Sequence, residues 1–361
     1  MALKTKLYDT HVSLKGHLVP FGGYLLPTHY SSIKNEHELV RSKAGLFDVS
    51  HMGEFIISGS GATEFLNEIT INDVAKINEW QAQYSAMCYD DGGIIDDILV
   101  YKYPEHYMLV VNCSNIEKNF DWIIANKPQN VDFANISSTI DLIALQGPKS
   151  RDILNKYTDV DLNKIDYYHF CIANIFGFPA TLSRTGYTGE LGYEIYADGN
   201  AIKNIWKSLL KYEDQIVPAG LGCRDTLRME MKYVLYGNDI NEKTNPIEAG
   251  LSWITKTNKV SFIGKEKLID LQLSHSKKLI CFEMIDRGIP RPGYLVSNDS
   301  GVIGTVTSGT QSPSLKKGIG IAYVDKKYSK TGTILFLNVR GRQLKCEIVK
   351  PPFYKKGSVF S

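Results

Sequence analysis

Residues 90–101 read DDGGIIDDILVY, a turn signal followed by a strand that contains two adjacent carboxylates. The Asp-Asp-Gly-Gly run predicts a tight turn, and the Ile, Leu and Val residues after it predict a buried strand. An ionised carboxylate among apolar neighbours costs several kcal/mol unless it is paired or hydrogen-bonded, and its pKa shifts. Asp96 and Asp97 are therefore either functional carboxylates, or one faces solvent while the other bonds to turn amides.

Alternation along the strand does not choose between these two carboxylates. One predicted face carries Ile95, Asp97, Leu99 and Tyr101, and the other carries Ile94, Asp96, Ile98 and Val100. Because adjacent strand residues point in opposite directions, only one carboxylate of the pair can reach a given pocket. The other then needs its own partner, which we expect to be a cation or backbone amides.

Composition and charge narrow the class of protein. The chain has 361 residues, 43% of them hydrophobic, with a net charge of +2 and no long block of one sign. This balance predicts a globular protein of two or three domains without nucleic acid or a membrane as its main partner. The N-terminus lacks an apolar signal region, and the six cysteines are scattered without metal-ligand spacing. We expect a cytoplasmic, metal-free protein with mostly reduced, buried cysteines.

The order of predicted elements is mixed α and β. Residues 84–112 predict an antiparallel meander, and residues 278–350 predict a separate C-terminal β-domain. Helices are expected from Ser31 or Ser32 to Lys43 and over residues 63–69, 201–210 and 226–232. Ser114 to Glu117 matches a capping box before a further helix. The polar, lysine-rich residues 256–276 suit a linker.

Motif searches exclude several common enzymes. The chain contains no complete G-x-G-x-x-G, no Walker A, no G-x-S-x-G and no H-E-x-x-H sequence. What remains is a set of polar and aromatic residues at junctions between loops and strands. Residues 184–194, RTGYTGELGYE, alternate glycines with Tyr and Glu, as expected either beside a planar ligand or in turns that bind nothing.

Four further side chains have both a binding and a structural interpretation. Arg224 can offer its fork to a ligand carboxylate or amide oxygen, or pair with an internal Asp. Tyr236 and Trp253 are large aromatics for which core packing is the more usual explanation. His51 resembles a general base, but we expect a hydrogen-bonded structural residue there.

Taken together, several segments resemble one known family. They are FDVSHMGEF, DDGGIIDDILVY, ALQGP, SRTGYTGELGYE, GLGCRDTLRME, LYGNDI, GTVTSGTQSPSLKKGIGIAYV and the closing KPPF. In this order and spacing, from about residue 7 to residue 353, the chain resembles the aminomethyltransferase, or T-protein, of the glycine cleavage system. A single motif would be weak, whereas eight in order are specific.

The resemblance implies an α+β fold of three domains in a cloverleaf around the folate, with antiparallel sheets, flanking helices and a C-terminal β-barrel or jelly-roll-like domain. The implied domains are residues 1–50 with 137–230, residues 51–136 with 231–275, and residues 276–361. The implied reaction transfers the methylene carbon of the aminomethyl group on the lipoyl arm of the H-protein to tetrahydrofolate. Its products are 5,10-methylenetetrahydrofolate, ammonia and the dihydrolipoyl protein, with no metal, flavin or nicotinamide.

The resemblance also assigns site residues. Asp97 matches the family's catalytic carboxylate, while Tyr187, Glu194 and Arg224 match its folate-contacting residues. Five further residues are expected to line the same pocket: Tyr84, Asn112, Tyr236, Trp253 and Met52. Some family members end in a Tyr-containing tail that reaches the folate, but PPFYKKGSVFS has no Tyr at the aligned place. No C-terminal residue is therefore assigned.

Three rivals share parts of this pattern. The first is a non-catalytic folate-binding relative that assists iron–sulfur assembly, but Cys171 and Cys223 lack its cysteine motif. The second is the folate domain of a flavin-dependent demethylating dehydrogenase, which would need a dinucleotide-binding domain. The third is a simple folate carrier, which would bind without turnover. Because the family's H-protein is acidic, we expect docking on a basic face to which Lys316, Lys317 and Lys355 contribute.

Overall fold

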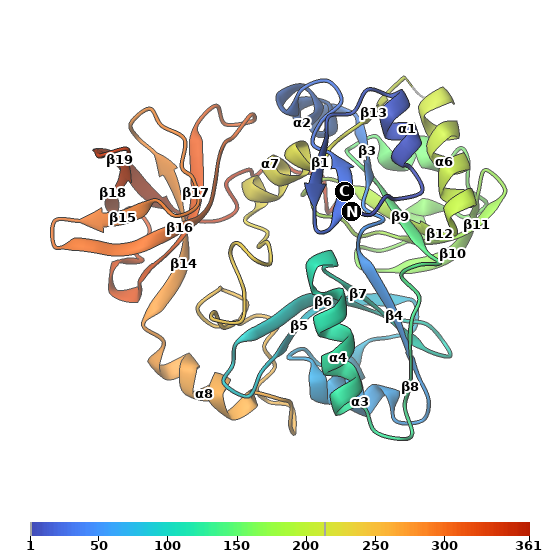
Figure 1. The fold of residues 1–361 in the computed structure, drawn as a ribbon, viewed down its shortest axis with the longest axis horizontal. Coiled ribbons are helices and arrows are strands. Elements are labelled where there is room, and N and C mark those ends of the chain that lie inside the picture. The colour runs from blue at the N-terminus through green and yellow to red at the C-terminus, as the bar shows by residue number, and fades with distance from the viewer. Residues whose placement is uncertain (1, 213) are drawn as a thin grey trace.

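The chain folds into three lobes that meet near the centre of the molecule, where both termini also lie (Figure 1). The computed structural model describes residues 2–212 and 214–361. Two lobes are antiparallel or nearly antiparallel sheets with helices against them, and the third is a closed barrel. The α+β fold with a C-terminal barrel, expected from the resemblance, is confirmed.

The first lobe contains a six-stranded sheet in the order β10-β11-β12-β9-β3-β13. Only the pairing of β13 with β3 is parallel among these neighbours. Its strands are β3 (Ala44–Asp48), β9 (Asp141–Gln146), β10 (Phe170–Ile175), β11 (Phe178–Ser183), β12 (Gly192–Ala197) and β13 (Ile216–Pro218). Beside it lie the hairpin of β1 (Leu18–Phe21) with β2 (Tyr24–Pro27), and helices α1 (Tyr8–Ser13), α2 (Ile33–Ser42), α5 (Ser150–Leu154), α6 (Gly199–Tyr212) and α7 (Leu221–Met231).

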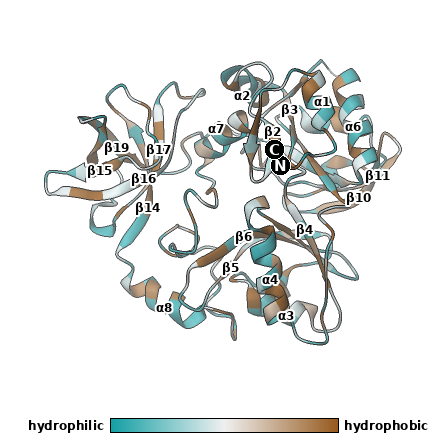
Figure 2. Ribbon diagram, viewed as in Figure 1, coloured by the Kyte–Doolittle hydropathy of each residue, from teal (hydrophilic) through white to brown (hydrophobic). Residues whose placement is uncertain are grey.

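Helix α6 illustrates how this sheet is covered. Ala201, Ile202, Ile205, Trp206 and Leu209 are all buried, at the spacing of one helical face. Hydrophobic and hydrophilic residues accordingly alternate along α6 in Figure 2. The expected α2 is confirmed as well, because the Ser32 hydroxyl caps it by accepting a hydrogen bond from the backbone N–H of Asn35.

The second lobe contains a five-stranded antiparallel sheet in the order β5-β6-β7-β4-β8. It confirms the meander predicted for residues 84–112. Its strands are β4 (Gly53–Ser58), β5 (Gln81–Cys88), β6 (Ile94–Lys102), β7 (Tyr107–Val111) and β8 (Asp132–Asn135), with helices α3 (Ala62–Ile69) and α4 (Ile116–Asn126) packed on it. The predicted capping box is wrong, because residues 113–115 form a 3-10 turn and α4 has no side-chain cap.

The third lobe is a barrel that closes in the order β14-β17-β16-β15-β18-β19. Its strands are β14 (Lys277–Met284), β15 (Leu295–Asn298), β16 (Gly301–Gln311), β17 (Gly318–Asp325), β18 (Ile334–Val339) and β19 (Arg342–Val349). The predicted linker before it is wrong in part, since α8 (Lys265–Ser274) occupies its second half and buries Leu268. The Lys259 ammonium is also buried and donates to the backbone oxygens of Asn67, Thr70 and Asn72.

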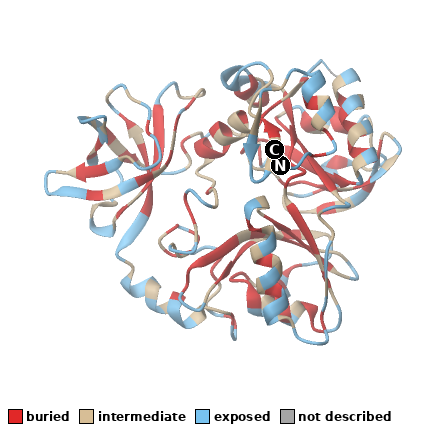
Figure 3. Cartoon of the chain, in the orientation of Figure 1, coloured by how far each residue is buried: buried red, intermediate tan, exposed pale blue. Residues whose placement is uncertain are grey.

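A bulge in β6 changes which face its residues occupy. Met87 pairs with Asp96 and Cys88 pairs with Ile94, so Ile95 is an extra residue between them. Ile95 therefore packs in the same core as Ile98 and Val100, and not with Leu99 as simple alternation predicted. Burial extends along most of β6, as Figure 3 shows for the strands of both sheets.

Helix α7 connects the first lobe to the barrel through a buried arginine. It begins at Leu221, five residues before the predicted start. The Arg228 guanidinium lies 2.7 Å from a carboxylate oxygen of fully buried Asp239 and donates to the Ser308 hydroxyl of β16. It also donates to the Asp225 carboxylate. Removing one partner of a buried ion pair leaves the other charge uncompensated.

Replacing Arg228 with Met should therefore lower the free energy of unfolding by about 3–5 kcal/mol, because Asp239 stays buried without its cation. Urea denaturation followed by circular dichroism measures this change. The matched control is Lys34→Met, which removes an exposed pair with Glu38 at 3.8 Å and should change stability by less than about 1 kcal/mol. Equal urea midpoints for the two variants would contradict the stabilising role assigned to the buried Arg228 ion pair.

Candidate active site

Asp97 is held in place from two neighbouring elements. The Tyr84 hydroxyl on β5 donates to Asp97 Oδ2 at 2.9 Å. The side-chain amide of Asn112, which directly follows β7, donates to Asp97 Oδ1 at 2.8 Å and to the Asp97 carbonyl at 3.1 Å. Asp97 is half-buried, and burial raises its pKa although these two donors lower it.

Asp96 is fully buried within a set of asparagines. It accepts from the backbone N–H and side-chain amide of Asn112, and from the side-chain amides of Asn115 and Asn119 at 2.6 Å each. A cation or backbone amides were expected as the partner of this carboxylate. The cation is wrong, and only one of the four donors is a backbone amide. Burial and the neighbouring Asp97 charge raise the pKa of Asp96 to about 7, against the effect of the asparagines.

The asparagine set was missed from sequence, although a signal was present. Asn115 and Asn119 are four residues apart and so share one face of the segment leading into α4. Both are buried, which is unusual for Asn without a partner. Polar residues at helical spacing beside a strand with two carboxylates predict a buried hydrogen-bond network.

A second group of predicted residues comes from the first lobe. The Arg224 guanidinium on α7 lies 4.9 Å from the centroid of the Tyr187 ring. Glu194 on β12 is buried, accepts from the Thr185 hydroxyl and interacts electrostatically with Arg224. Burial raises the pKa of Glu194 and lowers that of Arg224. The Arg224 Nη1 atom is buried and has no hydrogen-bond partner among the described residues.

The two groups face each other across the junction of the lobes. Tyr187 interacts electrostatically with both Asp97 and Tyr84. The Tyr187 hydroxyl donates to the backbone oxygen of Val234, and its ring stacks on Tyr233 with centroids 5.6 Å apart. The site therefore brings together side chains from two separate sheets and from α7.

The glycines between residues 184 and 194 serve packing inside the chain. A Cβ on Gly186 or Gly192 would lie 2.0 or 2.3 Å from the side chain of Gln146, and a Cβ on Gly189 would lie 2.4 Å from Met231. Gly189 also has φ of +77°, which favours glycine. These contacts explain the glycines of the loop, and they do not decide whether its side chains also face a ligand.

The remaining predicted residues surround Asp97 at different depths. Trp253 is 63% exposed and stacks on Tyr84 with centroids 6.1 Å apart, so core packing is the wrong explanation for it. Tyr236 donates to the Ile94 carbonyl and accepts from Lys118 at 2.7 Å. Met52 is half-buried and packs against the apolar core between the two sheets.

His51 is buried but is not the hydrogen-bonded residue that we expected. Its Nδ1 atom has no hydrogen-bond partner among the described residues. Its ring lies edge-on to Phe21 at 5.5 Å. Burial, assisted by the Arg224 charge, lowers its pKa to about 4 although Asp48 raises it. The imidazole is therefore neutral near pH 7.

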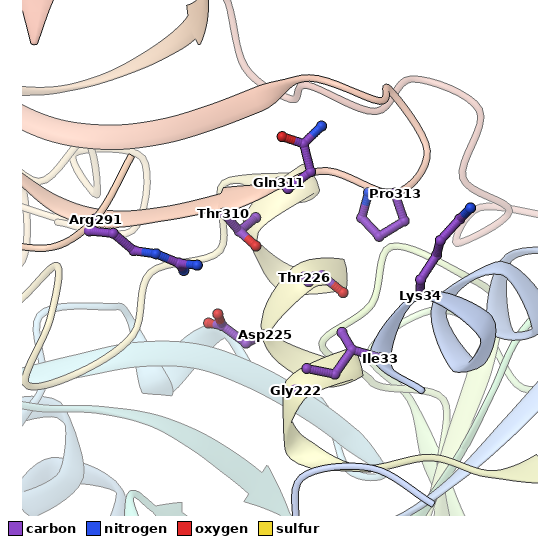
Figure 4. A pocket seen from close by; sticks show the side chains of 9 residues that line it. All are labelled: Ile33, Lys34, Gly222, Asp225, Thr226, Arg291, Thr310, Gln311 and Pro313. Atoms are coloured by element: carbon purple, nitrogen blue, oxygen red, sulfur yellow. The ribbon is translucent and has the colours of Figure 1, made fainter. Parts of the chain in front are cut away.

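A cavity of about 370 Å³ lies on another side of α7 (Figure 4). Gly222, Asp225 and Thr226 line it at i, i+3 and i+4 positions, and Arg224 lies off that face. The other walls come from α2, β16 and the loop that carries Arg291. None of the predicted site residues lines this cavity.

Three further features of the described residues concern metal sites, membrane spans and disulfides. Within residues 2–212 and 214–361, no group of three or more His, Cys, Asp or Glu side chains could hold a metal ion. No described helix is long and apolar enough to span a membrane. All six cysteines are free thiols, and four of them are buried as expected.

Comparisons with known proteins agree over the whole chain. Residues 7–259 match the family model described as the GCVT N-terminal domain, and residues 277–355 match the glycine cleavage T-protein C-terminal barrel domain. A curated aminomethyltransferase of Halothermothrix orenii is 46% identical over 97% of this chain and 99% of its own length. One of Bacillus licheniformis is 47% identical over 99% of this chain and 100% of its own length.

A solved structure extends this agreement to the fold. The glycine cleavage system aminomethyltransferase T of Bartonella henselae has a TM-score of 0.93 at 28% identity, and 99% of each chain is covered. The chain belongs to the glycine cleavage T-protein family and is an aminomethyltransferase of the glycine cleavage system.

Proposed function

We propose that tetrahydrofolate binds between the two groups of side chains, with Asp97 as its catalytic carboxylate. The observation that carries this proposal is the position of Asp97. It is half-buried, is fixed by Tyr84 and Asn112, and faces the residues of the first lobe that include Tyr187 and Arg224. A carboxylate with raised pKa in such a place is a common feature of active sites. The orphaned Arg224 Nη1 supplies a buried donor without an internal acceptor.

The proposed transfer balances in atoms and protons. The carbon of the S–CH₂–NH₂ group on the lipoyl arm forms bonds to N5 and N10 of tetrahydrofolate, while its bonds to sulfur and to the amine nitrogen break. The two N–H protons of the folate end on the thiol and on the departing ammonia. Asp97 orients N5 or N10 and stabilises the developing iminium charge, as well as or instead of accepting a proton.

The other side chains match the parts of a reduced folate. Glu194 can accept paired N–H groups from the pterin edge, and Arg224 can donate to an acceptor oxygen or to the anionic tail. Tyr187, Tyr84, Trp253 and Tyr236 offer ring faces to its flat portions. Asn112 and Met52 complete the proposed lining. No further organic cofactor and no nucleic acid is expected, and a cytoplasmic location remains a prediction.

The three sheets also support a division into three domains. We assign residues 1–50 with 137–230 to the first, residues 51–136 with 231–275 to the second, and residues 276–361 to the third. The chain passes from the six-stranded to the five-stranded sheet between β3 and β4, and it returns between β8 and β9. The two family-model matches are separated between residues 259 and 277, just before the barrel.

The lipoylated H-protein is the proposed protein partner, and a basic face near α7 is its proposed docking surface. The backbone N–H of Ser314 donates to the Glu230 carboxylate, and the backbone N–H of Tyr354 donates to the Glu230 carbonyl. Glu230 therefore joins the two segments that carry Lys316, Lys317 and Lys355. All three lysines are exposed. Lys317 also pairs with Glu283 at 3.1 Å, so Lys316 and Lys355 are the lysines of these segments that would chiefly attract an acidic partner.

Replacing Asp97 with Asn should lower turnover about 10²-fold or more, because the transition state loses its charged partner. The measurement is the initial rate of 5,10-methylenetetrahydrofolate formation from an aminomethyl-loaded lipoyl protein. Asp121→Asn, at an exposed position of α4, is the matched control and should keep the wild-type rate. A near-normal rate for Asp97→Asn would show that Asp97 is not the catalytic carboxylate.

Replacing Arg224 with Gln should raise the KM for tetrahydrofolate about tenfold or more, because a charged hydrogen-bond donor is lost from a buried position. The same assay at varied folate concentration measures this value. Arg342→Gln at an exposed position of the barrel controls for the change of charge. An unchanged KM in a correctly folded Arg224 variant would rule out contact with the folate.

Raising the salt concentration from 50 to 200 mM should weaken the complex with the H-protein, because counter-ions screen an exposed charged interface. Isothermal titration calorimetry measures the Kd at both concentrations. The double variant Lys316→Glu and Lys317→Glu should bind more weakly at low salt and show a smaller salt dependence. If salt has no effect on wild-type binding, the interface is not electrostatic.

A further inference from the structure

We propose that Asp96 is a positioning residue of the same site, which fixes the Asn112 amide that holds Asp97 and places a second negative charge behind the reacting carboxylate. This inference rests on the proposed role of Asp97. It goes beyond that role because it assigns a function in the site to Asp96, the fully buried carboxylate of the pair. It is supported by three hydrogen bonds of Asn112 and by the buried Oδ1 atom of Asn119, which has no partner among the described residues.

Asn112 joins the two carboxylates directly. Its side-chain amide nitrogen lies 2.7 Å from Asp96 Oδ1 and 2.8 Å from Asp97 Oδ1. Its backbone N–H also donates to Asp96 Oδ2 at 3.0 Å, so Asp96 holds both ends of the residue. A change in the charge of Asp96 therefore changes the amide that orients Asp97.

The donors around Asp96 favour its ionised form. Four N–H groups point to its two oxygens, which is the number of acceptor positions that a carboxylate has. Burial and the adjacent Asp97 charge oppose ionisation, and together they raise the pKa of Asp96 to about 7. The pKa of Asp97 is raised as well, so the ionisation of each carboxylate depends on the charge of the other.

Asn119 makes a protonated Asp96 possible as well. Its side-chain nitrogen donates to Asp96 Oδ2, while its Oδ1 atom is buried without a hydrogen-bond partner among the described residues. Half a turn of this amide would present Oδ1 to a proton on Asp96 without breaking another bond. The site can therefore hold Asp96 in either protonation state, as a group that titrates within a folded protein must.

Several ionisable side chains surround the pair. The side chains that interact electrostatically with it are Tyr84, Cys113, Lys118, Tyr168, Tyr187, Tyr236 and Asp239, with Glu242 beside Lys118 and Tyr236. Burial raises the pKa of Cys113 to about 11 and raises that of every tyrosine in this set. Asp239 is paired with Arg228.

The expected signature is a step in the pH–rate profile. As the pH rises through about 7, Asp96 ionises and adds a negative charge near the developing positive charge of the transferred carbon. Turnover of the wild-type chain should therefore rise about tenfold across this step, which is the effect of two opposite unit charges about 12 Å apart at an effective dielectric constant near 20. A wild-type profile that is flat between pH 6 and 8 would overturn the inference.

Two variants locate the step. Asp96→Asn should remove it and leave kcat about tenfold lower above pH 8, while the KM for tetrahydrofolate changes less than about twofold. Asn119→Leu should keep the step but move it upward by about one pH unit, because Asp96 loses a donor that favours its ionised form. Asn119 makes no contact with Asp97, so this shift can only pass through Asp96.

Asn126→Leu is the matched control on the same helix, since its amide donates only to the Trp122 carbonyl and is exposed. Its profile should overlay the wild type. If Asp96→Asn does not fold by circular dichroism, Asn119→Leu decides: an upward shift supports the inference, and an unmoved step overturns it. Loss of activity in Asp97→Asn together with a normal profile in both Asp96→Asn and Asn119→Leu would refute this inference alone. Normal activity in Asp97→Asn would refute the proposed function.

Discussion

Two adjacent carboxylates inside a buried strand cost several kcal/mol unless each finds its own donors. In this chain the donors come from three elements around β6. Tyr84 lies on β5, Asn112 directly follows β7, Asn115 directly precedes α4, and Asn119 lies in its first turn. The order β5-β6-β7 and the position of α4 over the sheet are therefore requirements of the Asp96–Asp97 pair, and a shift of one residue in either neighbour would leave a buried charge unsatisfied.

The site itself depends on the assembly of all three lobes. The second lobe supplies Asp97, and the first lobe supplies Tyr187, Glu194 and Arg224. Helix α7 carries Arg224 and is fixed on its other side to the barrel through Arg228 and Ser308. Glu230, at the end of the same helix, accepts from Arg41 of α2 and from Ser312 and Ser314 after β16. The barrel thus contributes no predicted ligand contact in the centre, but it sets the position of the arginine that faces Asp97.

The parts of the fold that were predictable are those with a strong local pattern. The meander, the capped helix α2 and the C-terminal β-domain follow from alternation, a serine cap and dense turn signals. The choice between Asp96 and Asp97 came from family resemblance, since both faces of the strand carry apolar residues. The bulge at Ile95 also makes simple alternation wrong for this strand. The helix α8 was missed because its sequence is polar and Leu268 is its one buried residue. The helical spacing of Asn115 and Asn119 was a signal for the asparagine network, but their partner Asp96 lies 19 and 23 residues away in sequence. Tertiary contacts of that kind leave little trace in a local pattern.

The exposure of individual side chains could not be predicted from the sequence either. Core packing was the more usual explanation for Trp253, although the resemblance placed it in the pocket; it stacks on Tyr84 with most of its surface free, which suits a residue that covers a ligand. The most direct measurement is a crystal structure of this chain with tetrahydrofolate bound. The account predicts an Asp97 carboxylate oxygen within hydrogen-bond distance of N5 or N10, while Asp96 keeps its four N–H donors and does not touch the folate. Folate in contact with Asp96, or bound away from Asp97, would contradict it.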